Sequence, residues 1–112
     1  MVRRYVPERG DVVWLNFTSQ AGHEQAGHRP ALVLSPATYN GKTGLMLCCP
    51  ITSQVKGYPF EVALDADIAS RGVILSDQVK SLDWRARRAR RKGIASKDVM
   101  DQTLARVRTL LD

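Results

Sequence analysis

Short apolar runs, rich in β-branched residues and separated by polar segments with Gly or Pro, make up most of this 112-residue sequence. Runs of this length are too short for good helices and favour strands. Several short strands must curl to enclose a core, so the pattern predicts a small, strongly curved barrel. The expected strands cover residues 10–17, 29–34, 45–51, 60–64 and 72–76, with a polar continuation over 77–80.

The last segment of the sequence predicts a helix. Ser96 is a good N-cap residue, and apolar residues recur with helical spacing from Val99 to Leu111. We expect this stripe to pack on the core. The predicted fold class is therefore mainly β with a C-terminal α-helix, and the chain length suits one domain over residues 1–112.

Three stretches are less regular. Ser35 followed by Pro36 predicts the start of a short helix, with Ser35 as its cap, and Asn40-Gly41 and Gly44 should end it after about two turns. Pro50 implies a strand end or an unpaired edge near the end of the run 45–51, because proline cannot donate to a ladder. The stretch 84–94 suits either a short helical turn or an exposed strand.

Composition limits the kind of protein. The chain is 44% hydrophobic and 25% charged, as soluble globular proteins are, and it has no apolar run near the roughly 20 residues of a membrane span. No apolar segment follows the basic start, so we expect a cytoplasmic protein. Cys48 and Cys49 are adjacent and should point to opposite faces of a strand, which argues against a disulfide. No metal-ligand spacing accompanies them, so we expect chemistry without metal or cofactor.

The positive charge is concentrated in one segment. The net charge is +6, and six of the 17 basic residues fall between Arg85 and Lys92, which leaves 11 to balance the 11 acidic residues. Such a patch attracts polyanions, so nucleic acid or an acidic protein segment is the expected partner. The alternative is a solvated face that serves only solubility.

Groups able to move protons are concentrated in the run 22–30. It holds His23, Glu24, His28 and Arg29, and its glycines and final proline indicate a loop that leads into a strand. Loops of this kind often carry function. The alternative is an ordinary polar hairpin tip.

If the polyanion is RNA, these residues suit cleavage without metal. Attack of a ribose 2′-hydroxyl on its own phosphate needs a base, an acid and a group that neutralises the phosphorane. Arg29 suits the last task, and Glu24 or His23 suits the base. Thr52 could donate a hydrogen bond to a phosphate oxygen.

Other side chains could hold the RNA. Lys56 and His28 could bind phosphate or supply a proton, and Phe17 and Tyr58 could stack on unpaired bases. Trp14 lies in mid-strand and is expected in the core. Each of these residues also has a structural alternative, such as a surface salt bridge or a strand-end hydroxyl.

Several short motifs follow one another along the chain: Gly-Asp-Val-Val-Trp at 10–14, Gly-x-Glu-Gln-x-Gly-x-Arg-Pro at 22–30, Val-Leu-Ser-Pro at 33–36, Pro-Ile-Thr at 50–52, Lys-Gly-Tyr-Pro-Phe at 56–60, Asp-Gln at 77–78 and Trp-Arg-Ala-Arg at 84–87. Together, in this order, they resemble the MazF/PemK toxin endoribonucleases, and most closely the MazF branch. The resemblance spans nearly the whole chain. It implies a homodimeric, SH3-like β-barrel of the CcdB/PemK type that cuts single-stranded RNA, chiefly mRNA, at a short sequence. It also implies a 2′,3′-cyclic phosphate and a 5′-hydroxyl as product ends, no metal, and a MazE-type antitoxin with an acidic tail.

The resemblance also assigns residues. Arg29 and Thr52 match the catalytic pair of the MazF branch, and Glu24 matches its loop carboxylate. Lys56 and Gln78 match positions on the RNA-binding surface. We expect further RNA contacts from the polar residues Ser53, Arg85 and Arg87.

The chain departs from both branches of the family. His23 stands where the PemK branch has a catalytic histidine and where the MazF branch commonly has serine, and Asp77 matches a catalytic acid of the PemK branch. Leu75 replaces that branch's functional arginine, which argues against a pure PemK-type mechanism. We expect His23 to assist catalysis rather than dominate it. Which of Glu24, His23 and His28 acts as base or acid stays open, as does the RNA sequence cleaved.

Two other functions are compatible with the same fold class. One is a non-catalytic toxin like the CcdB gyrase poisons, and the other is an SH3-like module that binds RNA or acidic peptides without chemistry.

Overall fold

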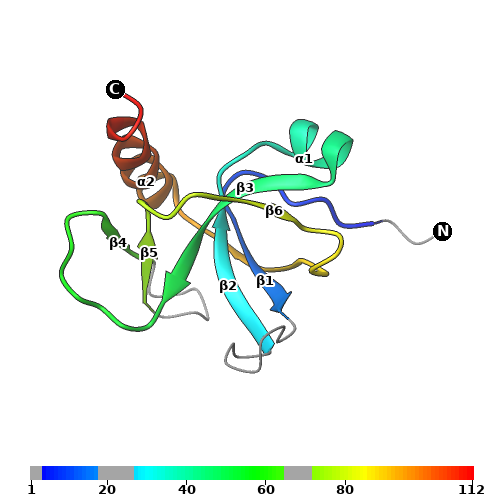
Figure 1. Cartoon of the computed structure of the whole chain (residues 1–112), viewed down its shortest axis with the longest axis horizontal. Helices are drawn as coiled ribbons and strands as arrows, with labels where there is room; N and C mark the ends of the chain where they lie inside the picture. The colour runs from blue at the N-terminus through cyan, green and yellow to red at the C-terminus, as the bar shows by residue number, and fades with distance from the viewer. Residues whose placement is uncertain (1–3, 18–26, 65–71) are drawn as a thin grey trace.

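The computed structural model describes residues 4–17, 27–64 and 72–112, and its fold is mainly β with a C-terminal helix, as predicted (Figure 1). The neighbouring strands pair antiparallel. The elements in chain order are β1 (Asp11–Phe17), β2 (Gly27–Val33), α1 (Ala37–Thr43), β3 (Leu45–Thr52), β4 (Glu61–Ala63), β5 (Val73–Leu75), β6 (Lys80–Asp83), β7 (Arg90–Ile94) and α2 (Lys97–Thr109).

The sheet curls because β3 changes partners along its length. The strands follow the order β4-β5-β3-β2-β1-β7, and β6 also pairs with β3. The first part of β3 pairs with β2 and β6, whereas Ile51 and Thr52 pair with β5. One strand therefore serves two sheets that face different ways, and the predicted curved barrel is present as a half-barrel (Figure 1).

Pro50 marks the point where β3 exchanges partners. It lies opposite Ala31 in the last pair between β2 and β3, and the strand then continues for two residues on β5. The expected interruption is therefore a change of partner rather than the end of the strand. β3 extends one residue beyond the expected run 45–51, and Thr52 is its last residue.

The core consists of two apolar clusters, one on each face of the curled sheet. Val12, Leu32 and Cys49 pack with Val99 and Met100 of α2 on one face. Residues adjacent to these in sequence point to the other face, where Cys48 is buried in the second cluster. The two cysteines lie on opposite faces and are both free thiols, as expected.

The second cluster lies beneath α1 and the turn that follows β6. Val13, Val33 and Met46 pack there against Trp84, which is 6% exposed. The stretch 84–94, which the sequence left open, is a turn over 84–88 followed by strand β7. β7 pairs with β1, with a bulge between Val12 and Val13.

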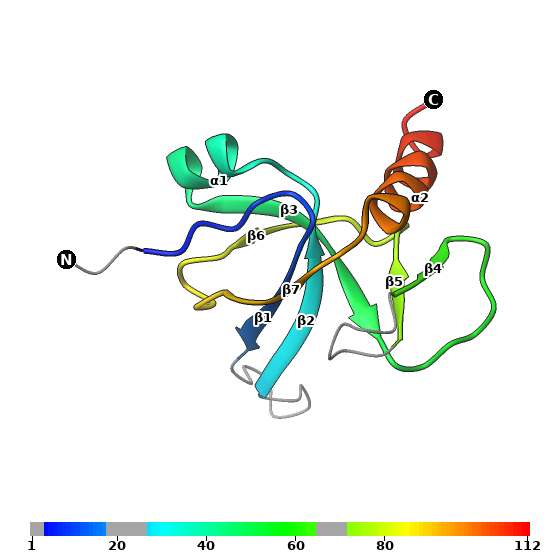
Figure 2. The same ribbon diagram turned by 180° about the vertical axis from the view of Figure 1, so that it is seen from behind.

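Helix α2 begins as predicted and covers the first cluster. The Ser96 hydroxyl accepts a hydrogen bond from the Val99 amide at 3.2 Å. Val99, Met100 and Thr103 are buried, but Leu110 and Leu111 are 49% and 80% exposed. The prediction that the whole stripe packs on the core is wrong for these last two residues, because the end of α2 projects beyond the sheet (Figure 2).

Ser35 is not the cap of α1. The N-cap is Pro36, which makes no side-chain capping bond. The Ser35 hydroxyl instead donates to Asn40 Oδ1 at 2.6 Å and accepts from the Leu47 amide at 2.8 Å. The prediction of a serine cap is wrong because tertiary partners take the hydroxyl.

A buried group of polar side chains, Ser35 and Asn40 with the main-chain atoms they bind, forms what we call the polar hub. Asn40 is 0% exposed, and its Nδ2 donates to the carbonyls of Pro7 at 2.8 Å and Ser35 at 2.9 Å. The Trp84 indole donates to the Asn40 carbonyl at 2.9 Å. The polar hub thus joins the N-terminal segment, α1, β3 and the turn after β6.

Candidate active site

Strands β2 and β3 part at one end of the molecule, and two predicted catalytic residues lie there. The last paired residues are Ala31 and Pro50. Continuing this register by two residues on each strand makes Arg29 level with Thr52. Beyond Pro50, however, β3 follows β5, and the ends of β2 and β3 lie apart (Figure 1).

Arg29 and Thr52 belong to the same face of the sheet. Side chains alternate along a strand, so Arg29 shares its face with Ala31, and Thr52 shares its face with Cys48. Ala31 and Cys48 are both members of the second apolar cluster. Arg29 is exposed and Thr52 is partly exposed, so both are accessible where the strands part.

The position of Thr52 is fixed by its neighbours. Its Oγ1 accepts a hydrogen bond from the Gln54 amide at 3.1 Å, and its hydroxyl still carries a proton to donate. Val73 of β5 is the pairing partner of Thr52. Gly72 precedes Val73 with φ +137°, and a Cβ there would lie 2.1 Å from the Thr52 carbonyl oxygen. Only glycine allows β5 to come this close to Thr52.

The loop over residues 53–60, which we call the 53–60 loop, leads away from Thr52. Ser53, Lys56 and Tyr58 are exposed, and Tyr58 retains 58% of its accessible surface. The Glu61 carboxylate accepts hydrogen bonds from the amides of Lys56, at 3.0 and 3.3 Å, and Gly57, at 2.9 Å. The exposed loop therefore has a defined shape next to Thr52.

Trp14 forms part of a surface beside β2 and is not a core residue. It is partly exposed, and the Lys92 ammonium lies 3.6 Å from the centroid of its ring. The His28 ring meets it edge-on, with centroids 6.4 Å apart. Burial against this surface lowers the pKa of Lys92. The core assignment is wrong because the face of β1 beyond α2 remains open to solvent.

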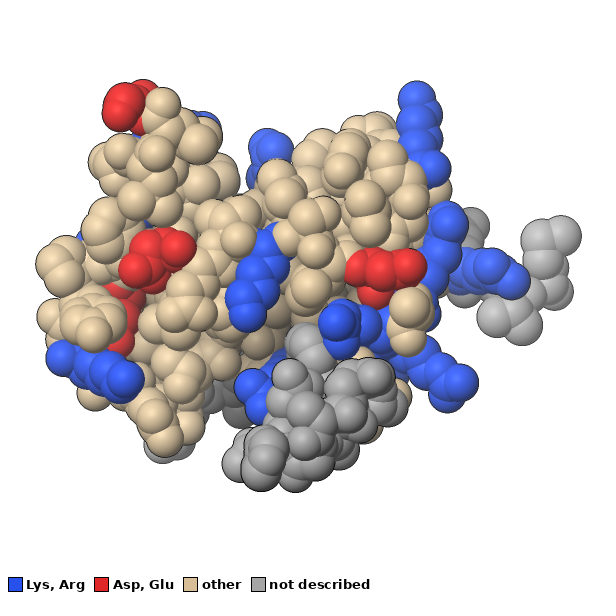
Figure 3. Space-filling model, in the orientation of Figure 1, with Lys and Arg blue, Asp and Glu red and all other residues tan. Residues whose placement is uncertain are grey.

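The basic segment 85–92 runs along the outer edge of β1. Arg90 lies opposite Trp14, and the Arg87 carbonyl accepts a hydrogen bond from the Asn16 amide at 2.8 Å. Basic side chains gather on this part of the surface, over the turn between β6 and β7 (Figure 3). Arg85 is also part of the fold, because its guanidinium donates to the Gly41 carbonyl at 3.0 Å.

Asp77 and Gln78 lie away from the end of β3 that carries Thr52. They are exposed in the turn between β5 and β6, where the Gln78 amide donates to the Leu75 carbonyl at 3.1 Å. Ile74 pairs with Ile51, and Lys80 pairs with Cys48, so this turn is level with the middle of β3. Within one chain, the fold does not bring Asp77 and Gln78 beside Arg29.

Three other predicted site residues are less fully placed. His23 and Glu24 lie outside the described residues. Phe17 ends β1 opposite Gly27. The described strands β1 and β2 therefore hold the backbones of Phe17 and Gly27 side by side, two residues along β2 from Arg29.

The two cysteines are poorly suited to nucleophilic chemistry. Burial is the main cause that raises the pKa of Cys48 to about 11 and that of Cys49 to about 12. Both are therefore thiols at neutral pH, and the thiolate is the reactive form. The described residues contain no cluster of three or more His, Cys, Asp or Glu that could hold a metal ion.

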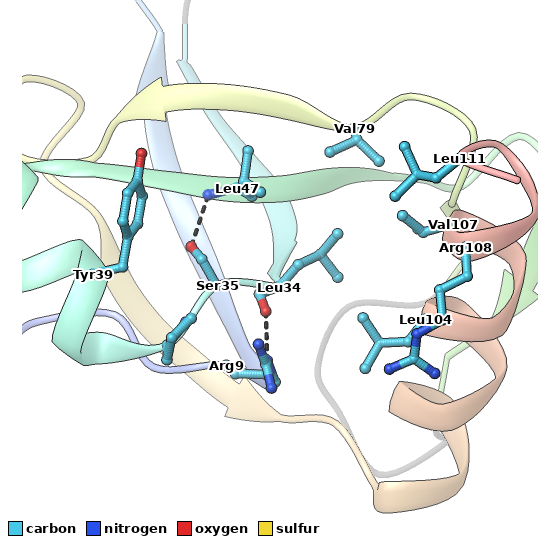
Figure 4. A pocket seen from close by; sticks show the side chains of 11 residues that line it. Arg9, Leu34, Ser35, Tyr39, Leu47, Val79, Leu104, Val107, Arg108 and Leu111 are labelled. Carbon is cyan, nitrogen blue, oxygen red and sulfur yellow. Dashed lines mark hydrogen bonds between the residues drawn. The ribbon is translucent and has the colours of Figure 1, made fainter.

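A shallow apolar groove lies on the side of the molecule that carries α1 and the end of α2 (Figure 4). Its volume is about 420 Å³. Leu47 and Leu111 line it and are 40% and 80% exposed. The other residues lining the groove are Arg9, Leu34, Ser35, Pro36, Tyr39, Val79, Leu104, Val107 and Arg108.

Within residues 4–17, 27–64 and 72–112, no helix is both long and apolar enough to cross a bilayer.

Comparison with known proteins decides the family. A family model described as the PemK-like, MazF-like toxin of type II toxin-antitoxin systems matches residues 8–111. The chain belongs to this toxin family.

Similar members of the MazF-like family agree over the full length. The endoribonuclease toxin MazF of Escherichia coli is 52% identical over 111 residues, which cover 99% of each chain. The endoribonuclease toxin ChpB of Escherichia coli is 38% identical over 100% of each chain. A crystal structure of MazE-MazF from Deinococcus radiodurans superposes with a TM-score of 0.92 and 58% identity, covering 96% of this chain and 97% of that one.

Sequence patterns did not indicate the role of Glu61. It falls within the expected strand 60–64, where nothing marks it out, yet its carboxylate binds two loop amides. The usable signal was Gly57 four residues earlier, since a glycine turn can direct consecutive amides toward one acceptor.

Proposed function

We propose that this MazF-like endoribonuclease toxin cleaves single-stranded RNA, chiefly mRNA, at a short sequence and without a metal ion. In this proposal a ribose 2′-hydroxyl attacks the adjacent phosphate and leaves a 2′,3′-cyclic phosphate and a 5′-hydroxyl. The observation that carries the proposal is the placement of Arg29 and Thr52, on one face of the sheet, at the ends of two strands that part. A guanidinium and a hydroxyl there can bind the two non-bridging oxygens of one phosphate.

Arg29 has the larger task in this mechanism. Charge accumulates on the phosphate oxygens as the 2′-oxygen attacks, and a planar guanidinium that is always protonated stabilises that charge without proton transfer. Thr52 donates from its hydroxyl to the other oxygen. The hydrogen bond from the Gln54 amide to Thr52 Oγ1 orients that hydroxyl.

The proton transfers are assigned to the segment that joins β1 to β2. We propose Glu24 as the base that receives the 2′-hydroxyl proton, with His23 as an assisting group. His28 adjoins Arg29 on β2, but neighbouring side chains on a strand point to opposite faces, and its ring contacts Trp14 on the other face of the sheet. We therefore assign His28 to RNA contact beside Trp14 rather than to proton transfer at the phosphate.

We propose that RNA extends from this site along two surfaces. One is the 53–60 loop, where Ser53, Lys56 and Tyr58 offer a hydroxyl, a charge and an aromatic ring. The other is the basic segment 85–92 beside β1, which supplies phosphate contacts. We assign Phe17 to base stacking at the end of β1.

We propose a MazE-type antitoxin as the protein partner. The solved relative from Deinococcus radiodurans was crystallised as MazE-MazF. An acidic antitoxin tail and RNA are both polyanions, so the basic segment 85–92 can bind either and make them compete. We therefore propose that the toxin acts in the cytoplasm, where mRNA is found.

We also propose that residues 1–112 form one toxin domain that functions as a homodimer. The apolar groove and the exposed end of α2, with Leu111 80% exposed, lie side by side and can be complementary across a two-fold axis. Exposed apolar patches of this kind mark interaction surfaces. A second copy is also a way to bring Asp77 and Gln78 to the RNA.

Incubation of the purified protein with a long single-stranded RNA in excess EDTA tests the proposal. We expect cleavage at a recurring short sequence, with fragments that carry 5′-hydroxyl ends. Binding without cleavage would favour the SH3-like module, and cleavage that needs added metal would contradict the mechanism. Inhibition of DNA gyrase without RNA cleavage would favour the CcdB-like alternative.

A further inference from the structure

The 53–60 loop is held in shape by polar contacts and not by burial. All of its residues from Ser53 to Pro59 are exposed. An exposed loop without apolar anchors loses conformational entropy when it is ordered, so its shape depends on the hydrogen bonds that hold it.

The Glu61 carboxylate is the central contact in this loop. Its Oε2 accepts from the Lys56 amide at 3.0 Å, and its Oε1 accepts from the Gly57 amide at 2.9 Å. Gly57 has φ +85°, the left-handed conformation that turns consecutive amides toward one acceptor. Hydrogen bonds to a charged acceptor are stronger than neutral ones. One side chain therefore determines the course of the backbone that carries Lys56 and Tyr58.

The base of the loop is fixed from two further directions. The Arg106 side chain of α2 donates through Nε to the Pro59 carbonyl at 2.8 Å. The Ser76 amide donates to the Phe60 carbonyl at 3.1 Å, and the Glu61 amide donates to the Tyr58 carbonyl at 3.1 Å. These contacts make the base of the loop rigid, so Glu61 acts from a fixed platform on the exposed residues 56–58.

We infer that Glu61 is a positioning residue for RNA binding, because its carboxylate holds the 53–60 loop in the shape that presents Lys56 and Tyr58 to RNA. The inference rests on the proposed RNA contacts of Lys56 and Tyr58. Glu61 itself does not touch the reacting phosphate. Its loss should therefore weaken RNA binding and leave the chemical step nearly intact.

The sign of the effect separates this role from simple electrostatics. Glu61 is an acidic residue close to a surface proposed to bind a polyanion, so removal of its charge alone should strengthen RNA binding. A positioning role predicts the opposite, since the loop becomes disordered and must be ordered again on binding. Asp101 provides a matched control, because it is an exposed carboxylate on α2 that forms an ion pair with the exposed Lys97 at 2.7 Å.

The test is steady-state cleavage of a short RNA by Glu61→Ala, Glu61→Gln and Asp101→Asn proteins. We expect Glu61→Ala to raise KM about tenfold with kcat within about twofold. Glu61→Gln, which keeps one accepting oxygen, should lie between it and the unchanged protein. Asp101→Asn should leave KM unchanged or slightly lower. A KM for Glu61→Ala that is unchanged or lowered, or a loss confined to kcat, would overturn the inference.

A double substitution tests whether Glu61 acts through the loop. Lys56→Ala removes the proposed phosphate contact and keeps the amide, so Glu61→Ala should raise KM by less than about threefold in that background. Full additivity of the two effects would contradict the positioning role. Amide hydrogen exchange at Lys56 and Gly57 should be faster in Glu61→Ala than in Asp101→Asn.

A second route to the same loop guards against a Glu61 variant that fails to fold. Arg106→Ala removes the contact to the Pro59 carbonyl from α2 and should raise KM in the same direction, by a smaller factor. If Lys56→Ala and Tyr58→Ala both leave KM unchanged, the proposed RNA contacts are wrong and the inference falls with them. If they raise KM while Glu61→Ala does not, only the positioning role is wrong.

Discussion

The polar hub and the 53–60 loop use similar side chains in opposite ways. In the polar hub, Asn40 is 0% exposed and Ser35 is 6% exposed, and their polar atoms bind partners within the fold. In the 53–60 loop, backbone amides are satisfied by Glu61 while the side chains of Lys56 and Tyr58 stay exposed. Buried polar groups that are fully bonded stabilise one fold, whereas exposed groups on a shaped backbone remain available to a ligand. The first region should control stability and the second should control activity.

The largest effect on activity is expected at Arg29, which, like Lys56 and Tyr58 of the 53–60 loop, is exposed and proposed to contact RNA. Arg29→Ala removes the group proposed to stabilise charge on the phosphorane, and kcat should fall about 1,000-fold. The melting temperature should change little, since the side chain is exposed. Arg29→Lys keeps the charge but not the planar fork and should recover only a small part of the rate. Equal activity of Arg29→Ala and the unchanged protein in an RNA cleavage assay would refute the assignment.

Asn40→Ala should show the reverse behaviour. It leaves the carbonyls of Pro7 and Ser35 and the hydroxyl of Ser35 without their Asn40 partners in a buried site. We expect a loss of about 3 kcal/mol in the free energy of unfolding, measured by urea titration. Well below the melting temperature, kcat and KM should stay within about twofold of their normal values. A selective loss of kcat in a fully folded Asn40→Ala protein would break the division between the two regions.

The basic segment 85–92 should affect binding more than stability. Replacing Arg88 and Arg90, which are both exposed, by glutamate should lower RNA affinity about tenfold at low salt and reduce the slope of affinity against salt concentration. The same pair of substitutions should weaken antitoxin binding. A matched control reverses two exposed charges on the helices, Lys42 and Lys97, and should change affinity much less. Equal effects from both pairs would mean that only net charge matters.

The smallest effect concerns backbone strain in that segment. Arg88 has φ 51°, a left-handed conformation that costs a non-glycine residue energy. Arg88→Gly should therefore raise the free energy of unfolding by about 0.5 kcal/mol, since relief of strain outweighs the added entropy of the unfolded chain. Arg90→Gly, within strand β7, should lower it. Destabilisation by Arg88→Gly in a thermal melt would show that the side chain contributes more than the strain costs.

Sequence patterns were informative where local rules decide the structure. The strand runs, the Ser96 cap and the opposite directions of Cys48 and Cys49 follow from propensity and from period-two alternation. Ser35 shows the limit of such rules, because its hydroxyl had tertiary partners that no local pattern indicates. Leu110 and Leu111 continue the helical spacing of apolar residues but lie beyond the sheet that α2 covers, so they are exposed. The spacing of apolar residues does not reveal where the sheet beneath a helix ends.

The candidate site was predictable in its residues but not in its arrangement. The sequence identified a guanidinium and a hydroxyl, yet their common level depends on the register of β2 and β3 and on the exchange of partners after Pro50. Glu61 was missed because its role depends on a turn that returns the chain to residues 56 and 57. Such contacts depend on loop geometry, which the type of residue at each position does not determine.

Cleavage of an RNA that carries one 2′-deoxy nucleotide tests the central claim most directly. The modified sugar should stand immediately 5′ of the phosphate that is cleaved in the all-ribose RNA, with binding of both RNAs measured in parallel. If Arg29 and Thr52 stabilise attack by the neighbouring 2′-hydroxyl, the modified RNA should bind with nearly normal affinity and remain uncut at that position. Cleavage of the modified RNA at the normal rate would contradict the account, because the nucleophile would have to come from elsewhere.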